Sequence, residues 1–298
     1  PRTPTGSGGS SGTGDSNGGG ERASLDTGFH HSTETGAFDI DLSGRTAIVT
    51  GAGRGIGEGI AGRLAEAGAN VVAAARTTDE IEAVVEAVEA EHGVEGLAVR
   101  TDLTDVDDVQ TLVDESVDAF GVPEILVNNA GANLMGDPME HSVQEVDTML
   151  DVNVRGTFLL TQRWGRAYRD AGLDWARVVN VSSVVAEVGT TPMALYGGTK
   201  AGVRGLTKGF AAALGGDGVT VNSVSPGITR VGRTAEAIES GAGGFLQLDR
   251  IPVGRAGEPA DVADVCAFLA SPQASYVTGV DVLVDGGVAF TAGLYGNG

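Results

Sequence analysis

The stretch TAIVTGAGRGIG, residues 46–57, joins a short β-branched run to a loop rich in glycine. An apolar run without polar alternation is typical of a parallel strand that is covered on both faces. Glycines after such a strand permit a tight turn, and they let a diphosphate approach the backbone N–H groups at the start of a helix. The strict pattern G-x-G-x-x-G is not met, but G-x-x-x-G-x-G is, through Gly51, Gly55 and Gly57. Because glycine is common in this chain, the loop needs support from other motifs.

Further short apolar runs follow, and they alternate with longer helical stretches. One of these stretches, Asp79–Glu91, carries Ile81, Val84, Val85 and Val88 on one face. Regular alternation of this kind predicts the α/β class, as a single doubly wound Rossmann-type domain with a seven-stranded parallel sheet flanked by helices. The expected strands are Thr46–Thr50, Asn70–Ala74, Gly96–Arg100, Ile125–Asn128, Arg177–Val181, Thr220–Val224 and Asp281–Val284.

The chain has 298 residues, and its composition changes once. Residues 1–38 are mostly Gly, Ser and Thr, so they cannot bury enough apolar surface to offset the entropy of ordering, and we expect a disordered tail. His30 and His31 lie inside it and are interpreted as incidental rather than as metal ligands. Residues 39–298 are expected to form the one folded domain.

The charge balance is strongly acidic, with 40 Asp and Glu against 19 Lys and Arg and a net charge of −21. Such a surface repels nucleic acid and anionic membranes. Among the basic residues only Lys200 and Lys208 are lysines. Few lysines beside many carboxylates indicate a halophilic protein, whose self-repulsion is screened by high salt.

No apolar run approaches the ~20 residues of a membrane span, and the N-terminus lacks the apolar stretch of a secretory signal. The single cysteine, Cys266, sits in an apolar helical stretch and reads as a small buried hydrophobe. A catalytic cysteine is the alternative, but no activating base is evident nearby. These features favour a cytoplasmic protein.

Tyr196 and Lys200 lie four residues apart, a spacing that stacks two side chains on one face of a helix. A phenol ordinarily has a pKa near ~10, which makes it a poor proton donor or acceptor at neutral pH. An ammonium one turn away favours the phenolate and lowers that pKa towards the working range. The pair therefore predicts a tyrosine that moves a proton, with a surface helix pair as the alternative.

Taken in order, the motifs make this chain resemble the short-chain dehydrogenase/reductase family over about residues 42–290. The motifs are T-G-x-x-x-G-x-G at Thr50–Gly57, N-N-A-G at Asn128–Gly131, the helix asparagine Asn153, the serine Ser183 thirteen residues before Tyr196, Tyr-x-x-x-Lys at Tyr196–Lys200, Pro226-Gly227, and Asp285-Gly286-Gly287.

The resemblance implies an oxidoreductase that interconverts a secondary alcohol and a ketone with a nicotinamide cofactor. Tyr196 is expected to donate or accept the proton, and Lys200 to lower its pKa and bind the nicotinamide ribose. Ser183 would hold the substrate oxygen. Asn153 resembles the residue that anchors a water linking Lys200 to solvent, with a purely helical role as the alternative.

The cofactor is expected to be NADP(H), with NAD(H) possible. Ala75 stands where an acidic residue would bind the adenosine ribose, and Arg76 and Arg54 could hold a 2′-phosphate. The alternative is that both arginines only form surface ion pairs. Asp102 resembles the residue that contacts adenine, or else caps the next helix. The expected cofactor-binding residues are Gly51, Arg54, Gly55, Ile56, Gly57, Arg76, Asp102, Asn128, Ala130, Gly131, Tyr196, Lys200, Pro226 and Gly227, and no metal is expected.

The substrate is expected to be a small carbonyl or alcohol, of the 3-oxoacyl thioester or of the sugar and polyol type. Its pocket would be lined by residues 184–195 and by a mobile lid over residues 228–250. Val231 stands where the family often has a threonine that contacts the carboxamide, with Thr229 earlier. A catalytically silent NADP-binding or scaffold protein is one alternative, and an extended epimerase or dehydratase is another. The resemblance also implies a homotetramer, through the helices at Asn153 and Tyr196 and the last strand.

Overall fold

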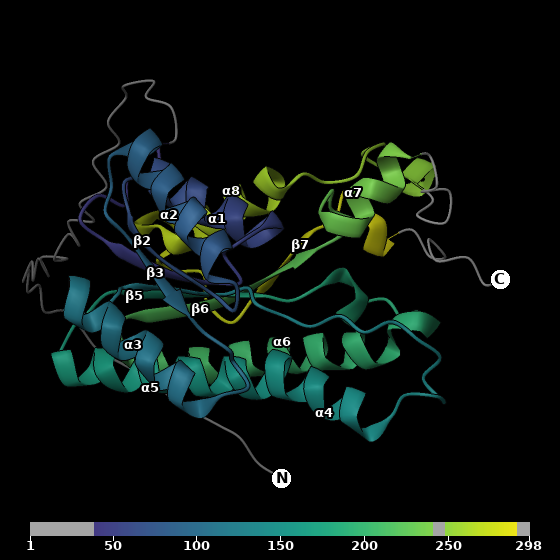
Figure 1. Cartoon of the computed structure of the whole chain (residues 1–298), viewed down its shortest axis with the longest axis horizontal. Coiled ribbons are helices and arrows are strands. Elements are labelled where there is room, and N and C mark those ends of the chain that lie inside the picture. The colour runs from purple at the N-terminus through teal and green to yellow at the C-terminus, as the bar shows by residue number, and fades with distance from the viewer. Residues whose placement is uncertain (1–38, 241–247, 291–298) are drawn as a thin grey trace, which may run out of the picture. The chain divides into compact units, whose positions relative to one another are not determined.

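The seven expected strands form one parallel sheet, in the order β3-β2-β1-β4-β5-β6-β7, in the computed structural model (Figure 1). The structure describes residues 39–240 and 248–290, with the side chain of Arg233 left out. The predicted fold class is confirmed. The strands are β1 (Thr46–Thr50), β2 (Asn70–Ala75), β3 (Gly96–Arg100), β4 (Ile125–Asn128), β5 (Ala176–Val181), β6 (Val219–Pro226) and β7 (Asp281–Val284).

Helices cover both faces of this sheet. In Figure 1, α1, α2 and α8 lie on one side of it and α3, α4, α5 and α6 on the other. The α-helices are α1 (Gly55–Glu66), α2 (Thr78–His92), α3 (Val106–Phe120), α4 (Val143–Leu150), α5 (Thr157–Ala171), α6 (Ala194–Leu214), α7 (Gly232–Glu239) and α8 (Pro259–Ala270). A π-helical segment, η1 (Asp151–Gly156), joins α4 to α5, and 3-10 turns include η2 (Val184–Ala186) and η3 (Thr191–Met193).

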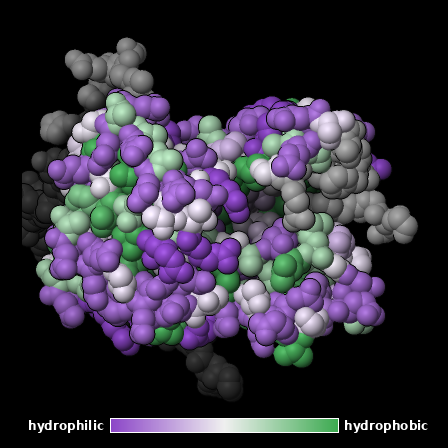
Figure 2. Space-filling view, viewed as in Figure 1, coloured by the Kyte–Doolittle hydropathy of each residue, from purple (hydrophilic) through white to green (hydrophobic). Residues whose placement is uncertain are grey.

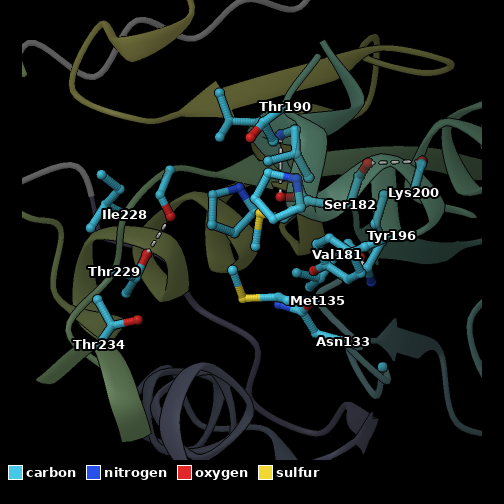
Figure 3. Close-up of a pocket in the computed structure, with 18 of the residues that line it drawn as sticks. Asn133, Met135, Val181, Ser182, Thr190, Tyr196, Lys200, Ile228, Thr229 and Thr234 are labelled. Carbon is cyan, nitrogen blue, oxygen red and sulfur yellow. Dashed lines mark hydrogen bonds between the residues drawn. The ribbon is translucent and has the colours of Figure 1, made fainter. Parts of the chain in front are cut away.

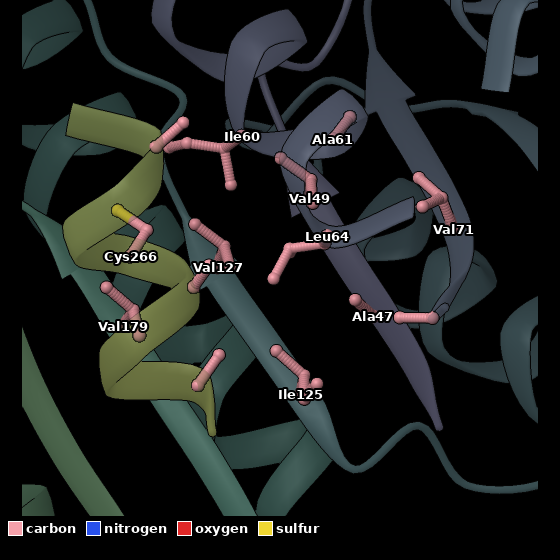
Figure 4. Packing of buried hydrophobic residues seen from close by; sticks show 14 of the residues in the cluster. Ala47, Val49, Ile60, Ala61, Leu64, Val71, Ile125, Val127, Val179 and Cys266 are labelled. Atoms are coloured by element: carbon pink, nitrogen blue, oxygen red, sulfur yellow. The ribbon is translucent and has the colours of Figure 1, made fainter. Parts of the chain in front are cut away.

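An apolar core fills the space between the sheet and the helices α1 and α8 (Figure 4). Leu64 of α1 and Val127 of β4 are completely buried there. Cys266 of α8 belongs to the same core, and burial raises the pKa of its thiol to about 12. A thiol with that pKa stays protonated at neutral pH, which fits the predicted buried hydrophobe and not a nucleophile.

The predicted element boundaries differ from the observed ones by a few residues. The sixth strand extends from the predicted Thr220–Val224 to Val219–Pro226, because it pairs with β5 on one side and with β7 on the other. The helix predicted at Asp79–Glu91 spans Thr78–His92 and ends at Gly93, which takes up a left-handed conformation with φ 68°.

The strand order fixes where a ligand can bind. The chain runs from β1 outward through β2 to β3, then returns to β4 on the other side of β1. The loops that follow β1 and β4 therefore leave the sheet in opposite directions, and ligands of doubly wound sheets bind in the crevice between such loops. The glycine-rich loop follows β1, and Asn129, Ala130 and Gly131 follow β4.

Hydrophilic side chains predominate on the face shown in Figure 2. The helices α2 and α3 carry acidic residues but no lysine or arginine, for example Glu82 and Glu86 on α2 and Asp114 and Asp118 on α3. Within the described residues, no helix combines the length and the apolar character that crossing a membrane requires. The predicted tail, residues 1–38, lies outside the described part of the chain.

Candidate active site

The glycine-rich loop has the conformation that its glycines predict. Gly51 and Gly55 have positive φ angles of 64° and 63°. A Cβ atom at Gly57 would lie 2.0 Å from the carbonyl oxygen of Gly51, so only glycine fits at the start of α1. This close approach leaves an open backbone cradle at a helix N-terminus, which suits a diphosphate.

Asn129 holds this loop in place, and sequence reasoning missed it. Its Nδ2 donates hydrogen bonds to the carbonyl oxygens of Thr50 at 2.9 Å and Gly51 at 3.1 Å. Its side chain also lines both cavities described below.

Asn128 departs from the expected role. It is 4% exposed, and its Nδ2 donates to Thr161 Oγ1 at 3.0 Å and to Asn180 Oδ1 at 2.8 Å. Asn128 lines neither cavity, since its side chain lies behind the site, among α5 and β5. The expected contact between the Asn128 side chain and a cofactor is therefore wrong. This side chain ties the sheet to α5, and the next residue, Asn129, lines both cavities instead.

A cavity of about 460 Å³ lies beyond the end of β2, and Arg54, Arg76 and Asp102 line it. Arg54 forms an ion pair with Glu80 at 3.4 Å, and its side chain is 82% exposed. Arg76 follows β2 directly and forms no ion pair within the described part of the chain. The alternative of a surface ion pair thus applies to Arg54, while Arg76 faces the cavity with its charge available to an anion.

Asp102 closes a turn at the rim of the same cavity. Its Oδ1 accepts from Thr104 N at 2.9 Å and from Thr104 Oγ1 at 2.8 Å. Burial raises the pKa of Asp102, but the hydrogen bonds from Thr104 and the charges of Arg76 and Arg100 outweigh it, so this pKa lies below its ordinary value. The N-cap of α3 is Asp105 rather than Asp102, so the alternative of a helix cap is wrong.

A second cavity, of about 1140 Å³, gathers Ser183, Tyr196 and Lys200 (Figure 3). Ser183 follows β5, and Tyr196 and Lys200 lie one turn apart on α6. Lys200 is 4% exposed, and its Nζ donates to the carbonyl oxygen of Val181 at 2.7 Å. Burial lowers the pKa of Lys200 to about 8. Its Nζ lies 5.8 Å from the centre of the Tyr196 ring, so a cation and a phenol face the same cavity.

The two cavities share a wall made of Ile56, Asn129, Gly131 and Val231. Pro226 and Gly227, at the end of β6, line the larger cavity. A site that runs from Arg76 past the glycine loop to Tyr196 has the extended form that a dinucleotide requires.

Asn153 lies beside this site in the π-helical segment η1 and is completely buried. Its Oδ1 accepts from Ala132 N at 2.8 Å, and its Nδ2 donates to Ala132 O and Thr199 Oγ1, both at 2.9 Å. Single π turns inside helices occur frequently at functional sites. The sequence indicated a helix here but not the π turn.

The segment expected to form a lid begins beside the larger cavity. The Oγ1 of Thr229 donates to Gly227 O at 3.3 Å, and Ile228, Thr229, Val231 and Thr234 line the cavity. Residues 241–247 of the predicted lid lie outside the described residues. Val231 touches both cavities, which is the place expected for the carboxamide contact, but its side chain offers no hydrogen bond. Among the described residues, no group of three or more His, Cys, Asp and Glu could hold a metal ion.

The sequence is similar to known reductases over most of its length. A family model described as enoyl-(acyl carrier protein) reductase matches residues 51–289. The 3-oxoacyl-[acyl-carrier-protein] reductase FabG of Staphylococcus aureus is 40% identical over 254 residues, which cover 82% of this chain and 98% of that protein.

Solved structures agree with this similarity. A provisionally assigned short-chain alcohol dehydrogenase from Sinorhizobium meliloti has a TM-score of 0.80 and 34% identity, over 85% of this chain and 99% of that chain. A provisionally assigned 2-deoxy-D-gluconate 3-dehydrogenase from Agrobacterium tumefaciens, solved with bound NADP, has a TM-score of 0.76 and 35% identity, over 85% of this chain and 99% of that chain.

Proposed function

We propose that this chain, which belongs to the short-chain dehydrogenase/reductase family, is an NADP(H)-dependent oxidoreductase that interconverts an uncharged ketone and its secondary alcohol. The observation that carries the proposal is the grouping of Ser183, Tyr196 and Lys200 in one cavity, joined to a second cavity that holds Arg76 and the glycine loop. A nicotinamide cofactor, when bound, supplies or accepts the hydride.

The three side chains have separate tasks in this reaction. Ser183 donates a hydrogen bond to the substrate oxygen and so orients the carbonyl group. Tyr196 gives its proton to that oxygen in reduction and takes it back in alcohol oxidation. Lys200, a cation held in a buried position, favours the phenolate form of Tyr196 once the proton has left. Asn153 lies next to Lys200 and supports its environment rather than touching the substrate.

The proposed cofactor specificity depends on Arg76 more than on Arg54. A 2′-phosphate would receive charge-assisted hydrogen bonds from the guanidinium of Arg76. Arg54 already faces the carboxylate of Glu80, which competes for its charge. The NADP found in the related structure from Agrobacterium tumefaciens is consistent with this assignment.

Arg76→Asp is expected to weaken NADPH binding by about 10- to 100-fold, because a carboxylate repels the 2′-phosphate. NADH binding should become stronger relative to NADPH binding, because the carboxylate accepts hydrogen bonds from the ribose hydroxyls. Dissociation constants for both cofactors, measured by fluorescence titration, test this. Arg54→Ala serves as the control and should change the NADPH constant less. Equal constants for NADPH and NADH in the unmodified protein would contradict the assignment.

The lining of the larger cavity favours an uncharged substrate. Lys200 is the one charged side chain among the described residues that line it, and Lys200 is directed to Val181 O. Apolar side chains such as Met135, Val185, Met193 and Ile228 provide most of the remaining surface, beside threonines. Among the described lining residues, a substrate carboxylate, such as that of a gluconate, would therefore find no cation other than Lys200. A 3-oxoacyl thioester, with an apolar chain and a neutral carbonyl, fits this lining better.

A substrate panel tests the proposed activity. The panel contains 3-oxoacyl thioesters, 2-enoyl thioesters, neutral aldoses and gluconates, each followed at the nicotinamide absorbance with NADPH or NADP in molar salt. Turnover of 3-oxoacyl thioesters without turnover of gluconates is the expected result. Turnover of gluconates or of 2-enoyl thioesters alone would contradict the substrate class. NADPH binding without turnover of any compound would favour the silent scaffold.

We also propose the homotetramer that the family resemblance implies. Large apolar side chains are exposed near both expected contacts: Leu150 and Phe158 flank the η1 segment, and Val280 and Phe290 flank β7. Phe158 packs against Phe210 of α6, with ring centres 5.4 Å apart, so an apolar contact joins α5 and α6 at this point. The second contact is expected close to residues 288–294, of which residues 291–294 lie outside the described part of the chain.

Salt is expected to stabilise this assembly. The net charge is −21, and residues 1–38 carry only four acidic and two basic residues, so nearly all of that charge lies on the folded part. The Debye length is about 30 Å at 0.01 M salt and about 3 Å at 1 M, so dilute buffer lets carboxylates repel one another across the whole domain. The melting temperature should rise by about 10 °C or more from 0.01 M to 1 M salt. This rise corresponds to an increase of roughly 3–5 kcal/mol in the free energy of unfolding.

Calorimetry and light scattering in dilute buffer and in molar potassium chloride measure this effect. A tetramer in high salt that dissociates in dilute buffer is expected, because each assembly gathers four such charges. A monomer in high salt would contradict the assembly. A melting temperature that does not change with salt would contradict the salt adaptation.

A further inference from the structure

Thr199 lies between the two catalytic candidates of α6 but borders neither cavity. It is 2% exposed. Its Oγ1 donates to the carbonyl oxygen of Tyr196 at 2.8 Å and accepts from Asn153 Nδ2 at 2.9 Å. A hydroxyl that both donates and accepts has a fixed direction, so Thr199 connects Asn153 rigidly to the helix that carries Tyr196 and Lys200.

The amide of Asn153 has its hydrogen-bonding capacity almost filled. Both Nδ2 hydrogens are used, one by Thr199 Oγ1 and one by Ala132 O, and Oδ1 accepts from Ala132 N. Three segments of the chain therefore determine where this amide lies: η1, the loop after β4 and α6. Thr199 supplies the contact to α6.

The position of this amide matters because its oxygen lies beside Lys200. A Cβ atom at Gly131 would lie 3.2 Å from Lys200 Nζ and 3.3 Å from Asn153 Oδ1. Both atoms thus border the same small space next to Gly131. In a buried environment of low dielectric constant, the electrostatic effect of this amide dipole on the ammonium depends on where the amide is held.

We propose that Thr199 is a positioning residue, whose hydroxyl fixes the amide of Asn153 in the space next to Gly131 that Lys200 also borders, and so keeps the proton-transfer group in its productive arrangement. This inference rests on the proposed function. Thr199 borders neither cavity, so its effect on turnover passes through Asn153 and the backbone of Tyr196.

The same helix offers a matched control in Thr207. Its Oγ1 donates to Val203 O at 3.0 Å and accepts from Asn180 Nδ2 at 2.9 Å, and it is 1% exposed. Thr207 therefore has the same burial and the same kind of hydrogen-bond pair as Thr199. Its asparagine partner, Asn180, accepts a hydrogen bond from Asn128 and does not border the space beside Gly131 and Lys200 that Asn153 borders. A purely structural loss should be equal at the two sites.

The test compares Thr199→Val with Thr207→Val, which remove one buried hydroxyl each and keep the side-chain shape. Thr199→Val is expected to lower kcat by about 10- to 100-fold, with KM and the NADPH dissociation constant changed by less than about threefold. Thr207→Val should lower the melting temperature to a similar degree and leave kcat within about twofold. Thr199→Ser, which keeps the hydroxyl, should restore most of the activity. Equal kcat values for the two valine variants would overturn the proposal.

A second measurement does not depend on turnover. The backbone N–H of Ala132 is held by Asn153 Oδ1, so its hydrogen exchange should be about tenfold faster in Thr199→Val than in Thr207→Val. If the unmodified protein turns over no compound, the proposed function fails, and this exchange rate alone decides the role of Thr199. Equal exchange in both variants would overturn it. Should Thr199→Val not fold, the alanine variants at both positions replace the valine ones.

Discussion

Tyr196→Phe is expected to lower kcat by about a thousandfold while leaving the fold and the binding of NADPH intact. The substitution removes one oxygen, and with it the group that gives the substrate oxygen its proton. Positioned acids and bases contribute about 10²- to 10⁴-fold to enzymatic rates. The cavity retains Ser183 and Lys200, so some orientation and electrostatic stabilisation of the substrate remains.

Steady-state rates on the best compound of the panel measure this effect. Circular dichroism and the NADPH dissociation constant serve as controls, and both should match those of the unmodified protein. Ser183→Ala should also lower kcat, but by less, because Ser183 orients the carbonyl group and Tyr196 moves the proton. Turnover by Tyr196→Phe close to that of the unmodified protein would show that another group carries the proton.

The sheet could be predicted because its strands are buried on both faces. Runs such as Ala47–Val49 and Ile125–Val127 are continuously apolar, and they are completely buried in the structure. The ends of elements were less accurate, since pairing with two neighbours extends β6 beyond its β-branched residues. Spacing along one helix was equally informative. The four-residue separation of Tyr196 and Lys200 predicts that they share a helix face, and in the structure both line the same cavity.

Positions that depend on contacts between distant segments could not be predicted. At the end of β4 a shift of one residue moves a side chain to the opposite face, and for this reason Asn128 faces α5 while Asn129 faces the cofactor cavity. The π turn at η1 is not marked by a local sequence pattern. Its Gly156 lies so close to Leu103, more than 50 residues earlier in the chain, that a Cβ atom at Gly156 would lie 2.8 Å from Leu103 Cβ. The pairing of Arg54 with Glu80, 26 residues later in the chain, is of the same kind.

Lys200→Arg is expected to lower kcat by at least about a hundredfold, although it keeps the positive charge. Lys200 is 4% exposed and its Nζ lies 2.7 Å from Val181 O, and a planar guanidinium is larger and cannot place a point charge there. Lys208→Arg is the matched control: Lys208 is the only other lysine of the chain and lies two turns further along α6, exposed to solvent. It should retain full activity. Equal activity of the two arginine variants would contradict the role given to Lys200.

The pH dependence of turnover separates charge from geometry at this position. Burial lowers the pKa of Lys200 from 10.5 to about 8, so the unmodified protein loses its ammonium as pH rises through about 8. Ketone reduction should slow over the same range, because the charge that favours proton release from Tyr196 disappears. A guanidinium stays charged throughout, so the residual activity of Lys200→Arg should lack this decline. A reduction rate that stays constant from pH 7 to about pH 10 in the unmodified protein would show that the charge of Lys200 is not required.

The stability of the fold should change with pH in the opposite direction. Between pH 8 and 10.5 the unfolded chain binds more protons at Lys200 than the folded chain does, so the free energy of unfolding rises with pH in that window.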